Sequence, residues 1–133
     1  MGDGSNYEAN TNQSDPLTYQ IIGAAIEVHR ELGPKLLESI YEEALCIELD
    51  LRQLSYERQK MIELNYKGHK IGTFFVDIIV ENSVIVELKS VANLAPVHEA
   101  QLISYLKLAG LRRGLLINFS VTTLREGIKR IIV

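Results

Sequence analysis

The chain of 133 residues has one cysteine, no tryptophan and no apolar run long enough to cross a membrane. A single cysteine excludes an intramolecular disulfide and a zinc site built from cysteines. A membrane-spanning helix needs about 20 predominantly apolar residues, and a signal peptide needs a basic segment followed by an apolar one. Both patterns are missing, so we expect a cytoplasmic protein that does not bind a membrane.

Positive charge is also in short supply, since the net charge is −3 at pH 7. This value gives no support to a general nucleic-acid-binding protein, which is usually basic. The charges are unevenly distributed, because residues 1–66 hold most of the acidic groups and residues 67–133 hold most of the basic ones. The asymmetry predicts one positive end of the molecule, although chance and solvated helix faces explain it equally well.

Apolar residues make up 47% of the chain, which is enough to build a core, and the length is that of one domain. Residues 1–14 contain almost nothing apolar, so we predict a flexible tail there. Asp15 followed by Pro16 is typical of the start of a helix. We therefore predict a single domain over residues 15–133.

Helical and strand-like hydrophobic periods follow one another along this domain. They predict helices over 16–32, 36–53 and 96–109, strands over 57–66, 70–80, 84–90, 114–119 and 127–133, and a turn of helix around Leu124. The strands over 70–80 and 84–90 are apolar on both faces, as in the middle of a sheet covered by helices. The sequence thus predicts an α/β fold in which strand 114–119 follows a crossover and is parallel to a neighbour.

The same periods predict which side chains form the core. In the helix over 36–53, the predicted apolar stripe consists of Leu37, Ile40, Tyr41, Ala44, Leu45 and Leu49. In the strand over 70–80, simple alternation places Phe74, Val76, Ile78 and Val80 on one buried face and Ile71, Phe75 and Ile79 on the other.

Three ionisable residues interrupt the doubly buried strands: Asp77, Glu87 and Lys89. If the hairpin turns around Asn82, Asp77 lies directly opposite Glu87, and Lys89 projects from the same face as Glu87. Opposed carboxylates repel each other, and a bound cation removes that repulsion. Because the donors are hard oxygens, we expect Mg²⁺ or Mn²⁺ between Asp77 and Glu87. The alternative is a buried ion pair between a carboxylate and Lys89, without a metal.

The helix after these strands carries polar residues on one side. His98, Gln101 and Tyr105 are spaced three and four apart, so they share one helix face. Such a face is suited to anchor a substrate phosphate or a metal-binding carboxylate, and it is equally the ordinary boundary between core and solvent. The basic residues expected to form a positive end for substrate phosphates are Lys89, Lys107, Arg112 and Arg113.

Four segments together resemble the GxxExxY family, which is placed in the PD-(D/E)xK nuclease superfamily. They are Leu32–Leu45, Val86–Ser90, Pro96–Leu106 and Gly114–Phe119. The resemblance spans about residues 17–133, with the motifs in the right order. Lys35 stands where the signature has its leading Gly, and Val76 stands where the superfamily has the proline before its catalytic Asp.

The resemblance implies a restriction-endonuclease-like core, with a central mixed β-sheet flanked by helices. It implies that Asp77 and Glu87 bind the metal, and that Lys89 lies near the attacking water. It also implies that Glu38 approaches the metal from the first helical region. Gln101 and Tyr105 match the Gln-x-x-x-Tyr helix found in exonuclease-like branches of the superfamily.

Taken together, the sequence predicts a metal-dependent nuclease that hydrolyses nucleic-acid phosphodiester bonds through a metal-activated water, with DNA favoured over RNA. The predicted site consists of catalytic Asp77, Glu87, Lys89 and Gln101, substrate-binding Tyr105, Lys107 and Arg112, and metal-binding Asp77, Glu87 and Glu38. The alternative is a catalytically silent module of the same fold that binds nucleic acid or a protein partner. A homodimer is left open.

Overall fold

Residues 15–133 are described by the structure, which is a computed structural model, and the tail predicted over 1–14 lies outside them. The helices are α2 (Pro16–Leu32), α3 (Glu38–Leu51), α4 (Pro96–Ala109) and the short 3₁₀ helix η1 (Leu124–Gly127). The strands are β1 (Tyr56–Tyr66), β2 (His69–Val80), β3 (Val84–Lys89), β4 (Arg113–Asn118) and β5 (Ile128–Ile132). The predicted elements are thus confirmed, with small shifts at their ends.

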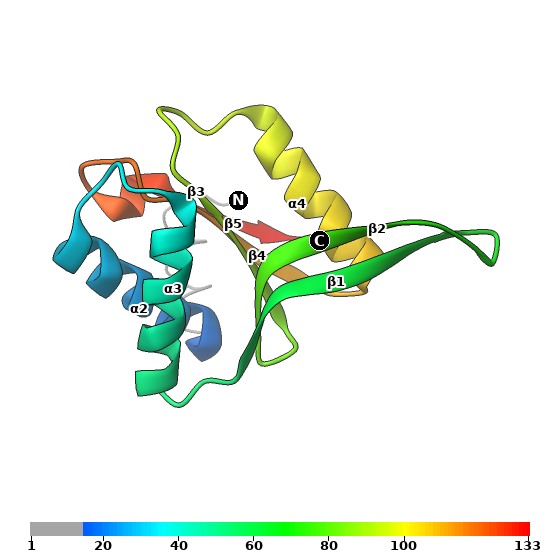
Figure 1. Cartoon of the computed structure of the whole chain (residues 1–133), viewed down its shortest axis with the longest axis horizontal. Coiled ribbons are helices and arrows are strands. Elements are labelled where there is room, and N and C mark those ends of the chain that lie inside the picture. The colour runs from blue at the N-terminus through cyan, green and yellow to red at the C-terminus, as the bar shows by residue number, and fades with distance from the viewer. Residues whose placement is uncertain (1–14) are drawn as a thin grey trace, which may run out of the picture.

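The five strands form one mixed sheet in the order β1-β2-β3-β4-β5. Strands β3 and β4 are parallel, and all other neighbours are antiparallel. Helix α4 joins the parallel pair across one face of the sheet, while α2 and α3 cover the other face (Figure 1). This architecture is the predicted restriction-endonuclease-like α/β fold. Across residues 15–133, no helix combines the length and the apolar character needed to cross a membrane.

The limits of α2 follow from the residues at its ends. The Asp15 side chain accepts a hydrogen bond from the backbone N–H of Thr18 (3.1 Å), and its ion pair with Arg113 ties the helix start to β4. Gly33 ends the helix with a φ of 77°, in the left-handed region that favours glycine. Helix α3 starts at Glu38 instead of residue 36, because Lys35 has a φ of 71° and the next residues are not yet helical.

Helix α3 has apolar residues on more than one side, and the sheet and α2 bury only one of them. Tyr41, Leu45 and Leu49 are fully buried. Leu37 and Ile40, which the sequence placed in the core, are 72% and 46% exposed. The prediction was wrong for these two residues, because periodicity does not say which of two apolar stripes faces the sheet.

Strand β2 does not keep the simple alternation that was predicted. Val76 packs with Ile79 in the core under α4, whereas Ile78 packs in the core under α2 and α3. Strict alternation would put residues 76 and 78 on one face, so the strand changes faces at Asp77. The ladder to β1 is irregular at the same level, since it lacks the pair Gln59–Asp77 and Gln59 has a φ of 47°.

Before Asp77, β1 and β2 form a hairpin that extends past the helices (Figure 1). Ile71 and Phe75, which were predicted to be buried, are 61% and 55% exposed. Phe74, on the other face, packs against the α4 core. The prediction was wrong because the helices do not cover the outer face of this hairpin, so only the last part of β2 is buried on both sides.

Candidate active site

The two carboxylates lie opposite each other where the β2–β3 ladder ends. The ladder pairs Ile78 with Val86, and the same register places Asp77 opposite Glu87, as predicted. The backbone N–H of Asp77 donates to Glu87 Oε2 (3.2 Å), and the backbone N–H of Leu88 donates to Asp77 Oδ2 (2.8 Å). Each side chain therefore accepts a backbone hydrogen bond from the opposite strand.

Glu87 is a buried carboxylate, with 7% of its surface exposed. Burial first, and the negative charge of Asp77 second, raise the pKa of Glu87 to about 8. A hydrogen bond between the two side chains also favours the protonated form, whereas the Asp77 N–H and the charge of Lys89 favour the ionised form. The two carboxyl groups are thus close enough to share a proton, and both cannot be ionised without a large electrostatic cost.

Lys89 lies two residues beyond Glu87, at the end of β3. Its positive charge acts on Glu87, which agrees with the predicted position on the same face. In the described part of the chain, its ammonium group makes no hydrogen bond or ion pair. The lysine is half-buried and is therefore available to an anionic ligand beside the carboxylates.

Tyr105 of α4 lies near enough to the carboxylate pair for the charges of Glu87 and Asp77 to act on its hydroxyl. Burial, followed by the charges of Glu87 and Asp77, raises the pKa of its hydroxyl. Gln101 forms a hydrogen bond with Tyr105, and the Tyr105 ring stacks on Phe74 with the ring centroids 4.3 Å apart. The structure thus brings the predicted Gln101 and Tyr105 together on the side of the sheet that carries Glu87.

His98 lies in the first turn of the same helix but has a local role. Its Nδ1 accepts a hydrogen bond from the backbone N–H of Ala95 (3.0 Å). This bond caps the start of α4, where backbone N–H groups have no partner inside the helix. His98 therefore stabilises the helix that presents Gln101 and Tyr105.

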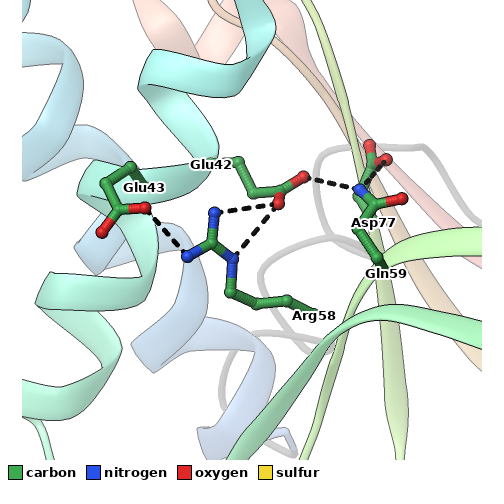
Figure 2. Close-up of polar contacts among 5 residues, drawn as sticks. All are labelled: Glu42, Glu43, Arg58, Gln59 and Asp77. Carbon is green, nitrogen blue, oxygen red and sulfur yellow. Dashed lines mark hydrogen bonds and ion pairs between the residues drawn. The ribbon is translucent and has the colours of Figure 1, made fainter.

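A second polar chain connects Asp77 to α3, and the sequence did not reveal it (Figure 2). Gln59 Nε2 donates to Glu42 Oε1 (2.9 Å) and approaches Asp77 Oδ1 (3.4 Å). Arg58 binds Glu42 through Nε (3.2 Å) and Nη2 (3.1 Å), and its Nη1 binds Glu43 (2.9 Å). The one available signal was the position of Glu42 four residues after Glu38, on the same side of the helix.

Glu38 itself is exposed at the first residue of α3. Tyr41, one turn on, is fully buried, and its hydroxyl donates to the Gly33 carbonyl and accepts from the backbone N–H of Leu36 (3.1 Å). The hydroxyl of Ser90, just after β3, donates to the Leu36 carbonyl (2.6 Å). The loop before α3 is therefore fixed to the end of the strand that carries Glu87 and Lys89.

The basic residues do not gather at one end as expected. The β3–β4 register pairs Arg113 with Val84 and Lys89 with Asn118, so Arg113 and Lys89 lie at opposite ends of the strand pair. Arg113 is also engaged by Asp15 and Ser83. Lys107 and Arg112 are exposed near the same end as Arg113. Of these residues, Lys89 alone stands beside the carboxylates, because α4 and β3 run in opposite directions along the sheet.

A divalent metal ion fits the Asp77–Glu87 pair by its donor chemistry. One oxygen of each carboxylate accepts a backbone N–H, which leaves Glu87 Oε1 without a backbone donor and Asp77 Oδ1 with a long contact to Gln59. Hard oxygens are the ligands of Mg²⁺, which is commonly held by one or two carboxylates and keeps several waters. Across residues 15–133, no three His, Cys, Asp or Glu side chains are placed to hold one ion, so Glu38 does not complete the pair in this structure.

Comparison with known proteins gives one match that covers nearly the whole described chain. The family model of the PD-(D/E)XK nuclease superfamily matches residues 15–131. Neither a curated protein nor a solved structure matches the chain in the corresponding comparisons. Nucleases of this superfamily generally depend on divalent metal ions. Because the match extends from the start of α2 to β5, the chain belongs to the PD-(D/E)XK nuclease superfamily.

Proposed function

We propose that this chain is a metal-dependent nuclease that hydrolyses phosphodiester bonds in nucleic acid, with DNA favoured over RNA. The observation that carries the proposal is the opposed pair Asp77–Glu87 at the end of the β2–β3 ladder, in which Glu87 is buried and Asp77 is partly buried. Two ionised carboxylates in this position oppose folding unless a proton or a bound cation compensates them. A divalent ion supplies that compensation, and a nucleic-acid phosphate is a natural further ligand for it.

Asp77 and Glu87 would hold the metal ion, which polarises the phosphate and lowers the pKa of water when it is bound. Lys89 would place a positive charge where negative charge develops on the phosphate in the transition state. The Tyr105 hydroxyl would donate a hydrogen bond to a phosphate oxygen, with Gln101 holding that hydroxyl in position. Glu42 and Gln59 would position Asp77 and do not themselves touch the substrate.

We also propose the narrower assignment to the GxxExxY family. The backbone at Lys35 supports it, because a φ of 71° is a conformation that glycine adopts without strain. The positive φ at this position explains why the family signature would have a glycine there. Tyr41, the last residue of the signature, holds the same loop through its hydroxyl.

A cleavage assay tests the proposed reaction. Labelled single- and double-stranded DNA and RNA are incubated with the purified chain in Mg²⁺, in Mn²⁺ and in EDTA. We expect cleavage that needs the metal and weakens steeply with salt, because phosphate contacts release counterions. Glu87→Ala and Lys89→Ala should each lose most of the activity, with a loss of roughly 10²-fold or more for the lysine.

The matched control is Arg30→Ala, which removes an exposed basic residue of α2 that pairs only with Glu27 among the contacts seen. It should retain wild-type activity. If both site variants cleave as well as the wild type, the activity belongs to a contaminant or to another site. If no nucleic acid is cleaved in any metal, the chain is a silent module, and the carboxylates serve only to close the β2–β3 ladder.

A further inference from the structure

Helix α3 presents an apolar stripe to solvent on the side away from the core. Its exposed members are Ile40, Ile47 and Leu51, at 46%, 52% and 72% exposure, and the N-cap residue Leu37, 72% exposed, lies beside its start. Ala44, between Ile40 and Ile47, is partly buried and packs against the core. The intervals of four, three and four residues from Ile40 through Ala44 and Ile47 to Leu51 match the a/d spacing of a coiled-coil seam.

The stripe is distinct from the face of α3 that holds the fold together. Tyr41, Leu45 and Leu49 form the buried face, at intervals of four residues. Each residue turns about 100° around the helix, so Glu42 lies about 200° from Ile40. The exposed stripe therefore points away from the Glu42–Gln59–Asp77 chain and is not part of the candidate active site.

The charges beside the stripe indicate which partner can cover it. All charged residues of α3 are acidic: Glu38, Glu42, Glu43, Glu48 and Asp50. In heptad positions, Glu43 and Asp50 flank one side of the seam and Glu48 flanks the other. A second copy of α3 would place acid against acid in either orientation, whereas a helix with flanking Lys or Arg would form ion pairs along both edges.

We infer that the outer face of α3 is a docking surface for a basic amphipathic α-helix of a partner protein. The partner helix packs its Leu, Ile or Val side chains along the seam and sets Lys or Arg against Glu48 and Asp50, one on each edge, while Glu43 is already paired with Arg58. Helix α3 has 14 residues, so two heptads of the partner cover it. The site is independent of the proposed nuclease activity.

Three synthetic peptides of about 21 residues, or three heptads, test the inference. The first has Ile at a, Leu at d and Lys at e and g. The second has the same seam with Glu at e and g, and the third has Ser along the seam with Lys at e and g. We expect the first peptide to bind, and the other two to bind about tenfold or more weakly than the first by fluorescence anisotropy.

A pair of matched variants locates the binding surface. Ile47→Ser/Leu51→Ser removes two exposed seam residues, and Met61→Ser removes an apolar residue of the hairpin whose exposure, 53%, is close to the 52% of Ile47. The first variant should weaken the Lys-flanked peptide about tenfold or more, and the second should leave its affinity unchanged. Circular dichroism melts verify that both variants remain folded, and amide NMR shifts should concentrate on the outer face of α3.

Three results would overturn the inference. The first is equal affinity for the Lys-flanked and Glu-flanked peptides. The second is a dimer of the chain alone in sedimentation that Ile47→Ser/Leu51→Ser converts to a monomer, since a second copy would then cover the stripe. The third is binding to phosphatidylcholine vesicles that the same variant abolishes, which would assign the stripe to lipid.

Discussion

Each face of the sheet carries one stacked pair of a tyrosine and a phenylalanine, and the two pairs differ in their surroundings. Tyr41 and Phe119 stack at 4.2 Å under α2 and α3, and both are fully buried. Phe74 and Tyr105 stack at 4.3 Å beneath α4, and both are only partly buried. The same ring contact therefore occurs once inside a closed core and once beside the carboxylates.

The tyrosine hydroxyls explain the difference. The hydroxyl of Tyr41 is bonded to two backbone groups of the α2–α3 loop, so it is fully used by the fold. The pKa of the Tyr105 hydroxyl is raised by burial and then by the charges of Glu87 and Asp77, so this hydroxyl lies within reach of their field. One face of the sheet thus carries the larger closed core, while the other combines a smaller core with the polar groups of the candidate site.

The largest effect should come from the buried stack. Phe119→Ala leaves a cavity in a closed core, and we expect it to lower the free energy of unfolding by about 3–5 kcal/mol. Phe74→Ala should cost clearly less, because Phe74 is already partly exposed. Urea unfolding of both variants measures the difference, and equal losses would show that the two faces contribute alike.

Removal of the two hydroxyls separates stability from activity. Tyr41→Phe leaves the partly buried Gly33 carbonyl and Leu36 N–H without their partner, so we expect a loss of about 1 kcal/mol and no loss of activity per folded molecule. Tyr105→Phe should change stability by less than about 0.5 kcal/mol. It should also lower the rate of metal-dependent cleavage. A Tyr105→Phe variant that is destabilised as much as Tyr41→Phe would contradict this division of roles.

The site face should also respond to pH. The folded pKa of Glu87, about 8, lies above its ordinary value of 4.5, so the folded state binds this proton more tightly than the unfolded state. That contribution is present at low pH and is lost as the pH rises toward 8. In EDTA, Glu87→Gln should therefore show a weaker fall of melting temperature between pH 5 and pH 8 than the wild type.

A bound metal ion should stabilise the folded protein at the pH at which Glu87 ionises, and so oppose the loss of stability described above. Mn²⁺ at pH 8 should raise the melting temperature of the wild type, because a ligand stabilises the state that binds it. Glu87→Gln should lose this rise, whereas Glu31→Gln, an exposed control on α2, should keep it. If Glu87→Gln destabilises the protein equally with and without Mn²⁺, Glu87 has a structural role and does not bind the ion.

The smallest effect concerns the loop that Tyr41 holds. Lys35 has a φ of 71°, which costs a residue with a side chain roughly 1 kcal/mol and costs glycine little. Lys35→Gly should therefore stabilise the protein by up to about 1 kcal/mol. The same substitution at Lys60, whose φ is not in the left-handed region, should destabilise it, and a gain at both positions would point to a general charge effect.

The order of elements and the register around Asp77 were predictable, because both depend on local patterns. A short turn at residues 81–83 and two alternating strands fix the pairing of Asp77 with Glu87. Capping residues such as Asp15 and Gly33 fix the helix ends. The parallel pairing of β3 and β4 follows from the crossover through α4.

The rest depends on how the elements are arranged in space. The exposure of Leu37 and Ile40 could not be predicted, because α3 has two apolar stripes and only one of them packs against the sheet and α2. The approach of Gln59 to Asp77 depends on the irregular backbone of β1 at Gln59, and no residue type in this segment predicts that irregularity. Lys89 and Arg112 were predicted to share one positive end of the molecule because both lie in the basic half of the sequence. They lie at opposite ends of the sheet because α4, which connects β3 to β4, runs back along the sheet.

The change of faces at Asp77 has a structural consequence. The part of β2 after Asp77 is fixed in the sheet, while the hairpin before it extends past the helices as an arm. Its tip at His69 lies eight residues from Asp77, or roughly 26 Å in an extended strand. Asp77 therefore stands at the junction of the arm and the buried part of the sheet, and its carboxylate is held on the sheet side by the Leu88 N–H. Side chains on the α4-facing side of the arm, such as Phe74, thus reach the same end of α4 as the carboxylates, although they belong to a part of the strand that the core does not enclose on both faces.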